Sequence, residues 1–172
     1  MIRSFVAALV LSLFVAGSAS AAKVDVSKLQ LAGDITQAQA EIVLKGALAK
    51  AVDQGVPMNI AVVDAGGNLK AFLRMDGAFL GSIDVSIGKA ETARRFNMST
   101  AALGAAAQPG GELFGIEVTN GRLVIFGGGE LLRDANGVII GAIGVSGGSV
   151  AEDTNVAKAG VAALEKAVKA KK

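Results

Sequence analysis

The stretch from Met58 to Arg74 constrains the fold more tightly than any other part of the sequence. Met58 to Asp64 is apolar at almost every position, which is typical of a central strand covered on both faces. The Ala-Gly-Gly-Asn run at residues 65–68 is a turn signal. Leu69 to Arg74 then alternates between apolar and polar side chains, as a half-exposed edge strand does. These features together predict an antiparallel hairpin.

Turn and breaker residues divide the rest of the chain into further elements. Strands are predicted at Arg122–Phe126, Glu130–Arg133 and Val138–Val145, the last two joined by a hairpin turn at residues 134–137. Helices are predicted at Asp34–Gln54, Ser82–Phe96, Ser99–Ala107 and after Asp153, which is expected to cap the final helix. Hairpin-like strand pairs with helices before, between and after them predict an α+β fold. We expect a single domain with a five-stranded antiparallel sheet and flanking helices.

The first 21 residues have the pattern of a secretory signal peptide. A short positive start is followed by an apolar run from Phe5 to Val15 and by a small-x-small site at Ala19-Ser20-Ala21. The apolar run is shorter than the roughly 20 residues that a membrane-spanning helix needs. We therefore expect a mature domain of residues 22–172 that is periplasmic or secreted, with no stable membrane insertion after cleavage.

The absence of His, Cys, Tyr and Trp from the sequence limits its chemistry. Ser-His-Asp and Cys-His catalysis, thiolate and imidazole metal sites and histidine-ligated haem are all excluded. Any catalysis would use carboxylates, lysine, arginine, hydroxyls or backbone groups. No catalytic base stands out, so whether the chain is an enzyme stays open. Its basic excess lies in a C-terminal run of lysines rather than on a face, which argues against a nucleic-acid partner.

Three polar features have both a structural and a functional interpretation. Lys89 shares a helix face with small residues and is either solvated or a buried anion binder. Arg74 and Asp76 end the return strand as a local ion pair or as polar groups at a pocket mouth. The Ser-Gly-Gly-Ser loop at residues 146–149 is either a plain connection or a set of free N–H groups that could hold a carboxylate or phosphate.

Five motifs in order resemble the GlcG/HbpS-type haem-binding family, also described as the PduO C-terminal-like domain. They are GVPMNIAVVDAGGNLKAFLRMDGA, SIGKAETA, FGGGELL, GVIIGAIGVSGG and AEDTNVAKAG, and the resemblance covers about Ile35 to Leu164. It implies a five-stranded antiparallel sheet with helices, assembled as a homo-oligomer. It also implies haem binding in a secreted protein, with a role in haem or iron handling.

The resemblance further implies where haem would contact this chain. Thr100 is the nearest match to a threonine hydroxyl that contacts haem iron in a secreted relative, and Met98 offers a softer thioether ligand. Lys89, Arg74 and Arg94 are candidates to pair with the haem propionates.

Three functions therefore remain open from the sequence. The first is a secreted or periplasmic haem or tetrapyrrole binder. The second is a binder of a small organic acid, or an enzyme acting on one, through Arg74, Asp76 and Lys89 around the glycine loop. The third is a structural homo-oligomer without a retained ligand site.

Glu130 departs from the proline or apolar residue usual in the family, and its charge argues against haem if the pocket edge lies there.

Overall fold

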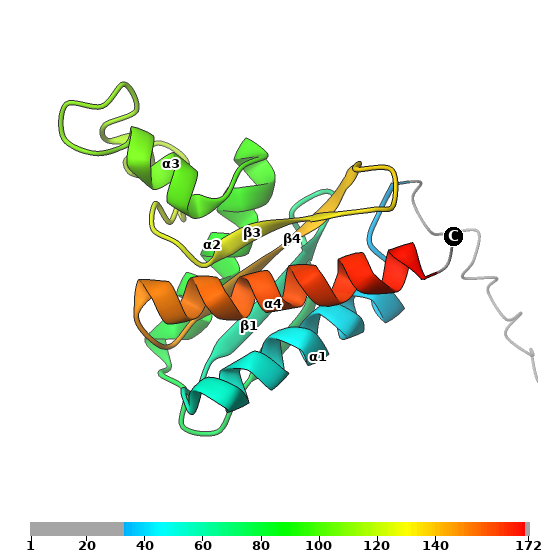
Figure 1. Ribbon diagram of the computed structural model, residues 1–172. Coiled ribbons are helices and arrows are strands. Elements are labelled where there is room, and N and C mark those ends of the chain that lie inside the picture. Colours follow the sequence, from blue (N-terminus) through cyan, green and yellow to red (C-terminus); the bar gives the residue numbers. More distant parts are fainter. Residues whose placement is uncertain (1–32, 171–172) are drawn as a thin grey trace, which may run out of the picture.

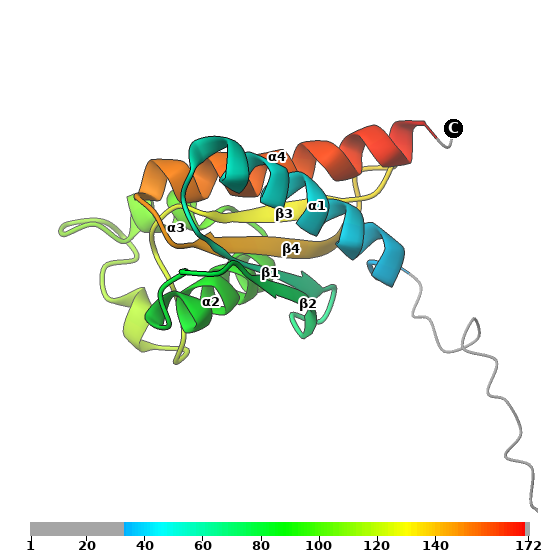
Figure 2. The same ribbon diagram turned by 90° about the horizontal axis from the view of Figure 1, so that it is seen from below.

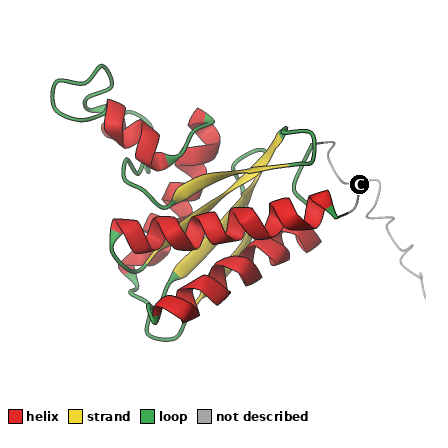
Figure 3. Cartoon of the chain, in the orientation of Figure 1, coloured by secondary structure: helices red, strands yellow, loops and turns green. Residues whose placement is uncertain are grey.

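The structure is a computed structural model that describes residues 33–170 (Figures 1 and 3). The predicted signal peptide, residues 1–21, lies outside this range. The elements are α1 (Gln37–Gln54), β1 (Asn59–Asp64), β2 (Leu69–Arg74), α2 (Gly81–Phe96), α3 (Thr100–Ala106), the 3-10 helix η2 (Ile116–Val118), β3 (Gly129–Arg133), β4 (Ile139–Ser146) and α4 (Val150–Lys169). Within residues 33–170, no helix combines the length and the apolar character that crossing a membrane would require.

The strands form one antiparallel sheet in the order β2-β1-β4-β3. The two central strands, β1 and β4, are buried at nearly every position, as their apolar sequences predict. Helices α1 and α4 lie side by side on one face of the sheet, and α2 covers the other face (Figures 1 and 2). The α+β class and the two hairpins are therefore confirmed.

The prediction of five strands is wrong for the described chain, which has four. Residues 122–126 were expected to form the additional strand, but they run along α2 instead of beside a strand. The Val124 N–H donates to the Thr92 hydroxyl at 3.0 Å. A Cβ on Gly88 would come within 3.0 Å of the Arg122 carbonyl oxygen, so the missing side chain lets this backbone approach the helix. An apolar run that packs along a helix has the same sequence signature as one that pairs in a sheet.

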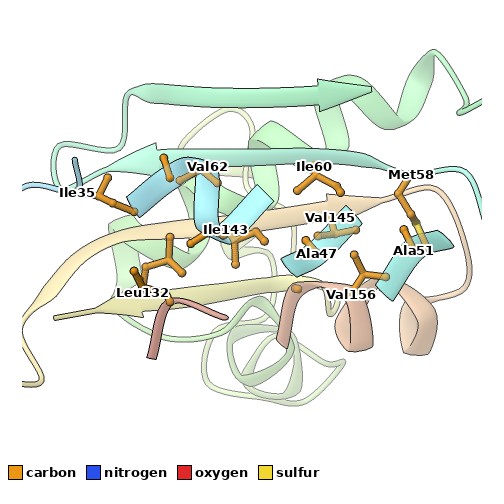
Figure 4. Close-up of a cluster of buried hydrophobic side chains, with 14 of the residues drawn as sticks. Ile35, Ala47, Ala51, Met58, Ile60, Val62, Leu132, Ile143, Val145 and Val156 are labelled. Carbon is orange, nitrogen blue, oxygen red and sulfur yellow. The ribbon is translucent and has the colours of Figure 1, made fainter. Parts of the chain in front are cut away.

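The main hydrophobic core lies between the sheet and the α1–α4 layer (Figure 4). The central strands and both helices contribute many of its members, among them Ile60, Val62, Ile143, Val145, Val43, Val156 and Leu164. A smaller cluster on the opposite face packs under α2 and is built mainly of small residues: Ala61, Val63, Ala90, Ala93 and Ala142. Gly144 of β4 belongs to this face, where a Cβ would meet the Ser86 carbonyl oxygen of α2 at 2.0 Å. A glycine at this position therefore allows the α2 backbone to approach the strand closely.

The first helix packs closely against α4 through small residues. Its fully buried positions are Ala40, Val43, Ala47 and Ala51. The larger Leu44 and Leu48 are only partly buried. A Cβ on Gly46 would overlap the Cβ of Ala163 in α4 at 2.4 Å, so small residues set the distance between α1 and α4.

Two helices begin with a capping box. Thr36 caps α1: its hydroxyl accepts the Gln39 backbone N–H at 3.2 Å, and its own backbone N–H donates to Gln39 Oε1 at 2.9 Å. Ser149 caps α4 in the same way with Glu152. The expectation that Asp153 caps this helix is wrong, because Ser149 occupies the cap and the Asp153 carboxylate has other partners.

Candidate functional site

Helix α2 carries a lysine into the interior at one end of the sheet. The Lys89 side chain is fully buried, and its ammonium lies 2.7 Å from Oδ2 of Asp153. It also donates to the Val145 carbonyl oxygen at 2.9 Å. Because α2 and α4 pack on opposite faces of the sheet, the Lys89–Asp153 pair joins the two helix layers beside the start of β3.

The glycine run before β3 makes room for this pair. Gly128 has a φ of +112°, and a Cβ there would lie 2.8 Å from both the Lys89 Nζ and the Val145 carbonyl oxygen. The ring centroid of Phe126 lies 4.6 Å from the same Nζ, which is cation–π distance. The Phe126 side chain is 45% exposed, so it separates the ammonium from solvent.

Two N–H groups just before the start of α4 already have partners within the chain. The Gly148 N–H donates to Oδ1 of Asp153 at 3.0 Å, and the Ser149 N–H donates to Glu152 at 2.8 Å. The loop at residues 146–149 therefore uses these N–H groups to bind two carboxylates of α4. The buried interpretation of Lys89 is correct, and the anion that it holds is Asp153.

Burial has a clear effect on the titration of the Lys89 amine. Loss of hydration lowers the pKa of Lys89 below the ordinary lysine value, while the hydrogen bond and charge of Asp153 act in the opposite direction. An amine of this kind could act as a base or nucleophile where a substrate reaches it. Here the ammonium is paired with Asp153 and is not accessible to a ligand from solvent. The ion pair therefore cross-links α2 to α4.

The junction of α2 and α3 brings together three of the predicted site residues. Thr100 is buried, and its hydroxyl accepts the Gly129 N–H at 2.9 Å. Met98 is 37% exposed at the surface of the junction. Arg94 donates from Nη1 to Asn97 at 2.6 Å, while its buried Nε has no hydrogen-bond partner among residues 33–170.

The other two predicted residues lie elsewhere. Arg74 and Asp76 are both exposed at the end of β2, the strand at the opposite edge of the sheet from β3. Within the described chain neither side chain forms an ion pair. The structure therefore does not gather Arg74, Asp76 and Lys89 into one pocket.

Sequence reasoning missed a buried polar residue beside Arg74. Asn59 is the Cα partner of Arg74 on one side and of Ser146 on the other. Its Nδ2 donates to the Phe79 carbonyl oxygen at 3.0 Å, which ties β1 to the turn before α2. Its Oδ1 is buried and has no partner among the described residues. An asparagine inside an otherwise apolar central strand was the signal that could have identified it.

A cavity of about 370 Å³ lies between the β3 end of the sheet and α4. Its lining includes Ser99, Glu130, Leu131, Arg133, Val161 and Glu165. Burial raises the pKa of the half-buried Glu130 carboxyl, and the nearby charge of Lys158 partly offsets this. Glu130 thus lies at a cavity. This cavity is lined by both polar and apolar side chains and is not an apolar pocket.

Comparison with known proteins gives a consistent result. Residues 35–162 match the family model described as haem degrading protein HbpS-like. The chain is 44% identical over 133 residues to the 15.0 kDa protein in the dhaT-dhaS intergenic region of Citrobacter freundii, covering 77% of this chain and 93% of that protein.

Two further relatives are similar over most of the described domain. The corrinoid adenosyltransferase PduO of Citrobacter freundii is 38% identical over 70% of this chain, which spans only 36% of that longer protein. The crystal structure of a PduOC–haem complex superposes with a TM-score of 0.72 at 34% identity, covering 76% of this chain and 94% of the other.

Proposed function

The chain belongs to the family of HbpS-like haem degrading proteins, and on this premise we propose that it binds haem or a closely related tetrapyrrole. One observation on the chain's own residues supports the proposal. At the α2–α3 junction, the exposed Met98 thioether follows four residues after Arg94, whose Nε is buried without a partner in the described chain. A soft ligand for iron and a cation for a propionate thus occur in one short segment.

The structure ranks the candidate contacts. With no His, Cys or Tyr in the sequence, iron ligation falls to a weak donor, and Met98 is accessible. Thr100 would have to release the Gly129 N–H before its hydroxyl could face a ligand. For the propionates Arg94 is the best candidate, because Lys89 is already paired with Asp153 and Arg74 lies at the other edge of the sheet.

The proposal includes a homo-oligomer in the periplasm or outside the cell. The signal-like pattern of residues 1–21 supports export. The role in haem or iron handling is proposed from the family match alone. Several large apolar side chains just before α2 and after α3 are exposed, as expected of surfaces that another copy covers: Phe79, Leu80, Leu113, Phe114, Val118 and Phe126. The segment from the end of α3 to η2 extends away from the sheet (Figure 1).

The alternative of a small organic acid as ligand has weaker support. It relied on Lys89 and the glycine loop as an anion site, but the Lys89 ammonium and the Gly148 N–H both bond to Asp153. A homo-oligomer without any ligand remains the other outcome of the same test.

Hemin titration, followed through the Soret band, tests the proposal. We expect saturable binding by the full chain and an altered Soret position in Met98→Leu, which removes the sulfur and keeps the apolar volume. Arg94→Ala should weaken binding about tenfold if it loses a charge-assisted contact. Arg95→Ala is the matched control, because Arg95 is exposed and pairs with Glu91. Non-saturable uptake that is equal in all variants would contradict haem binding.

A further inference from the structure

Strand β3 forms an open edge of the sheet. The Gly129 N–H points away from β4 and donates to the Thr100 hydroxyl at 2.9 Å. The register with β4 is unbroken from Gly129 to Leu132, so alternation along the strand places both backbone groups of Leu131 on the same outer side. No strand among residues 33–170 pairs with β3 on that side. An uncovered edge of this kind can take up a further strand.

Two adjoining cavities leave this edge accessible. The cavity of about 370 Å³ described above is lined by Leu131 and Arg133 of β3 and by Val161 and Glu165 of α4. A second cavity of about 310 Å³ shares Arg133 and Glu165 with it and continues to Lys169 at the end of α4. A strand added to β3 would therefore lie beside α4.

Helix α4 and strand β3 run in the same direction (Figure 1). Leu131 and Val161 line the first cavity, while Asp134 and Val168, each farther along the chain, line the second. The middle of β3 thus lies beside the middle of α4. A two-fold axis that passes through Leu131 would consequently pass close to Val161 as well.

The spacing of the layers fits a second copy at this edge. Antiparallel pairing of β3 with β3 of another copy would join the two sheets across such a two-fold axis. Because α4 packs on both β3 and β4, the two α4 axes would lie about two strand spacings apart, roughly 10 Å. Packed helices lie roughly 8–10 Å apart, so strand pairing and helix packing can occur in the same dimer.

The charges on this side of α4 are complementary under the same symmetry. Lys158 and Glu165 are about two helical turns apart, with Val161 between them, and so share one side of the helix. Burial raises the pKa of Glu130 on β3 and the charge of Lys158 partly offsets this, which places Lys158 near β3. Within the described chain, Glu165 has only an exposed contact of 3.9 Å with Lys169. In an antiparallel α4 pair centred next to Val161, each Lys158 faces Glu165 of the partner subunit.

We propose that two copies of this chain form a dimer through β3, with the sheets joined at Leu131 and the two α4 helices antiparallel at Val161. The N–H and C=O of Leu131 in each copy bond to those of Leu131 in the other. Lys158 of each copy pairs with Glu165 of the other, and the second copy fills the two cavities beside β3. The dimer specifies one interface of the homo-oligomer proposed above and rests on that part of the proposed function.

A single cysteine tests the strand pairing, because the chain contains no native cysteine. Directly opposed residues in an antiparallel pair have Cα atoms about 5.5 Å apart, which a disulfide can bridge. We expect Leu131→Cys in the full chain to give a disulfide-linked dimer under mild oxidation, detected by nonreducing electrophoresis. Leu69→Cys is the matched control for random collision, because Leu69 lies on the opposite edge strand β2 and is 52% exposed. It should cross-link roughly ten times more slowly.

Charge reversal on α4 gives an independent readout that leaves β3 intact. Lys158→Glu and Glu165→Lys should each raise the dissociation constant of the dimer about tenfold, because each brings like charges together twice across the two-fold axis. The double variant Lys158→Glu/Glu165→Lys should recover most of this loss. Lys166→Glu, at an exposed position of the same helix, is the matched control and should leave the dimer unchanged. Sedimentation over a dilution series measures these constants.

The outcomes separate this interface from the rest of the proposed function. A chain that stays monomeric at every concentration would overturn the interface together with the homo-oligomer. An oligomer in which Leu131→Cys forms no disulfide, and its thiol stays reactive towards a maleimide, would overturn the interface alone and assign the β3 edge to another occupant. Charge reversals that leave the dissociation constant unchanged, or losses that the double variant does not recover, would also overturn it. Neither readout involves hemin, so the outcome is independent of haem binding.

Discussion

Lys89 on α2 and Asp153 on α4 form a buried ion pair of 2.7 Å around the end of the sheet, although their helices pack on opposite faces. Removing one partner leaves a buried charge without compensation. We therefore expect Asp153→Ala to lower the free energy of unfolding by about 3–5 kcal/mol in urea denaturation. Asp53→Ala is the control, since Asp53 pairs with Lys50 at 2.6 Å on the surface, where solvent screens the charges, and its loss should leave the free energy of unfolding almost unchanged.

The double variant Lys89→Met/Asp153→Leu separates the cost of an unpaired charge from the value of the pair. Because two apolar side chains need no partner, it should recover much of the stability that Asp153→Ala loses. Strictly additive losses from the two positions would show that the residues act independently, contrary to the observed contact.

The titration of Lys89 should affect how the free energy of unfolding depends on pH in alkaline solution. Burial lowers its pKa in the folded protein below the ordinary value of 10.5, so the unfolded chain binds this proton more tightly. As the pH increases from the pKa of Lys89 in the folded protein to its pKa in the unfolded chain, the free energy of unfolding should therefore increase. The Lys89→Met variant should not show this increase.

The background in this pH range is simple. The chain has no His, Cys or Tyr, so the remaining groups that titrate there are the other lysines and the N-terminal amine. Urea unfolding from pH 8 to 10.5 compares the two proteins. A contribution that falls as the pH rises would mean that Asp153 raises the pKa of Lys89 overall.

Much of the fold follows from local sequence patterns. The central strands, the turn at residues 65–68 and the boundaries of α1 and α2 were predictable because apolar periodicity and capping residues act over a few positions. The conformation of residues 122–126 was not predictable, since an apolar pattern does not say whether the run packs along a helix or pairs with a strand.

The candidate site was less predictable because its contacts are distant in sequence. Asp153 and Ser149 are both suitable helix caps by type. Only Lys89, 64 residues away from Asp153, decides which of them is free to cap. The same contact explains why Lys89 is buried in spite of its charged sequence neighbours.

Gly128 should tolerate no side chain. In Gly128→Ala the new Cβ would press on the Lys89 Nζ and the Val145 carbonyl oxygen, in addition to straining a positive φ. Gly110→Ala is the control: its φ is +84° and nothing lies within 4 Å, so it isolates the backbone strain of about 1 kcal/mol. We expect thermal unfolding to show a loss at Gly128 that exceeds the control by about 2 kcal/mol or more. Equal losses would show that the glycine is needed only for its backbone conformation.

Thr100 has a structural role that can be separated from any contact with haem. Its hydroxyl is the buried acceptor for the Gly129 N–H at the start of β3. Thr100→Val keeps the shape but leaves that N–H unsatisfied, so the free energy of unfolding should fall by about 1–3 kcal/mol. Thr100→Ser restores the acceptor and should recover most of the loss, and Thr119→Val, at an exposed hydroxyl, should have little effect.

The Soret band of bound hemin, measured where Thr100→Val remains folded, distinguishes the two roles. If the hydroxyl serves only β3, the spectrum will be unchanged in Thr100→Val and altered in Met98→Leu. A changed spectrum in Thr100→Val with an unchanged one in Met98→Leu would reverse the ranking of the two ligands. It would also imply that haem binding frees the Gly129 N–H, and exchange of that amide should then accelerate when hemin is added.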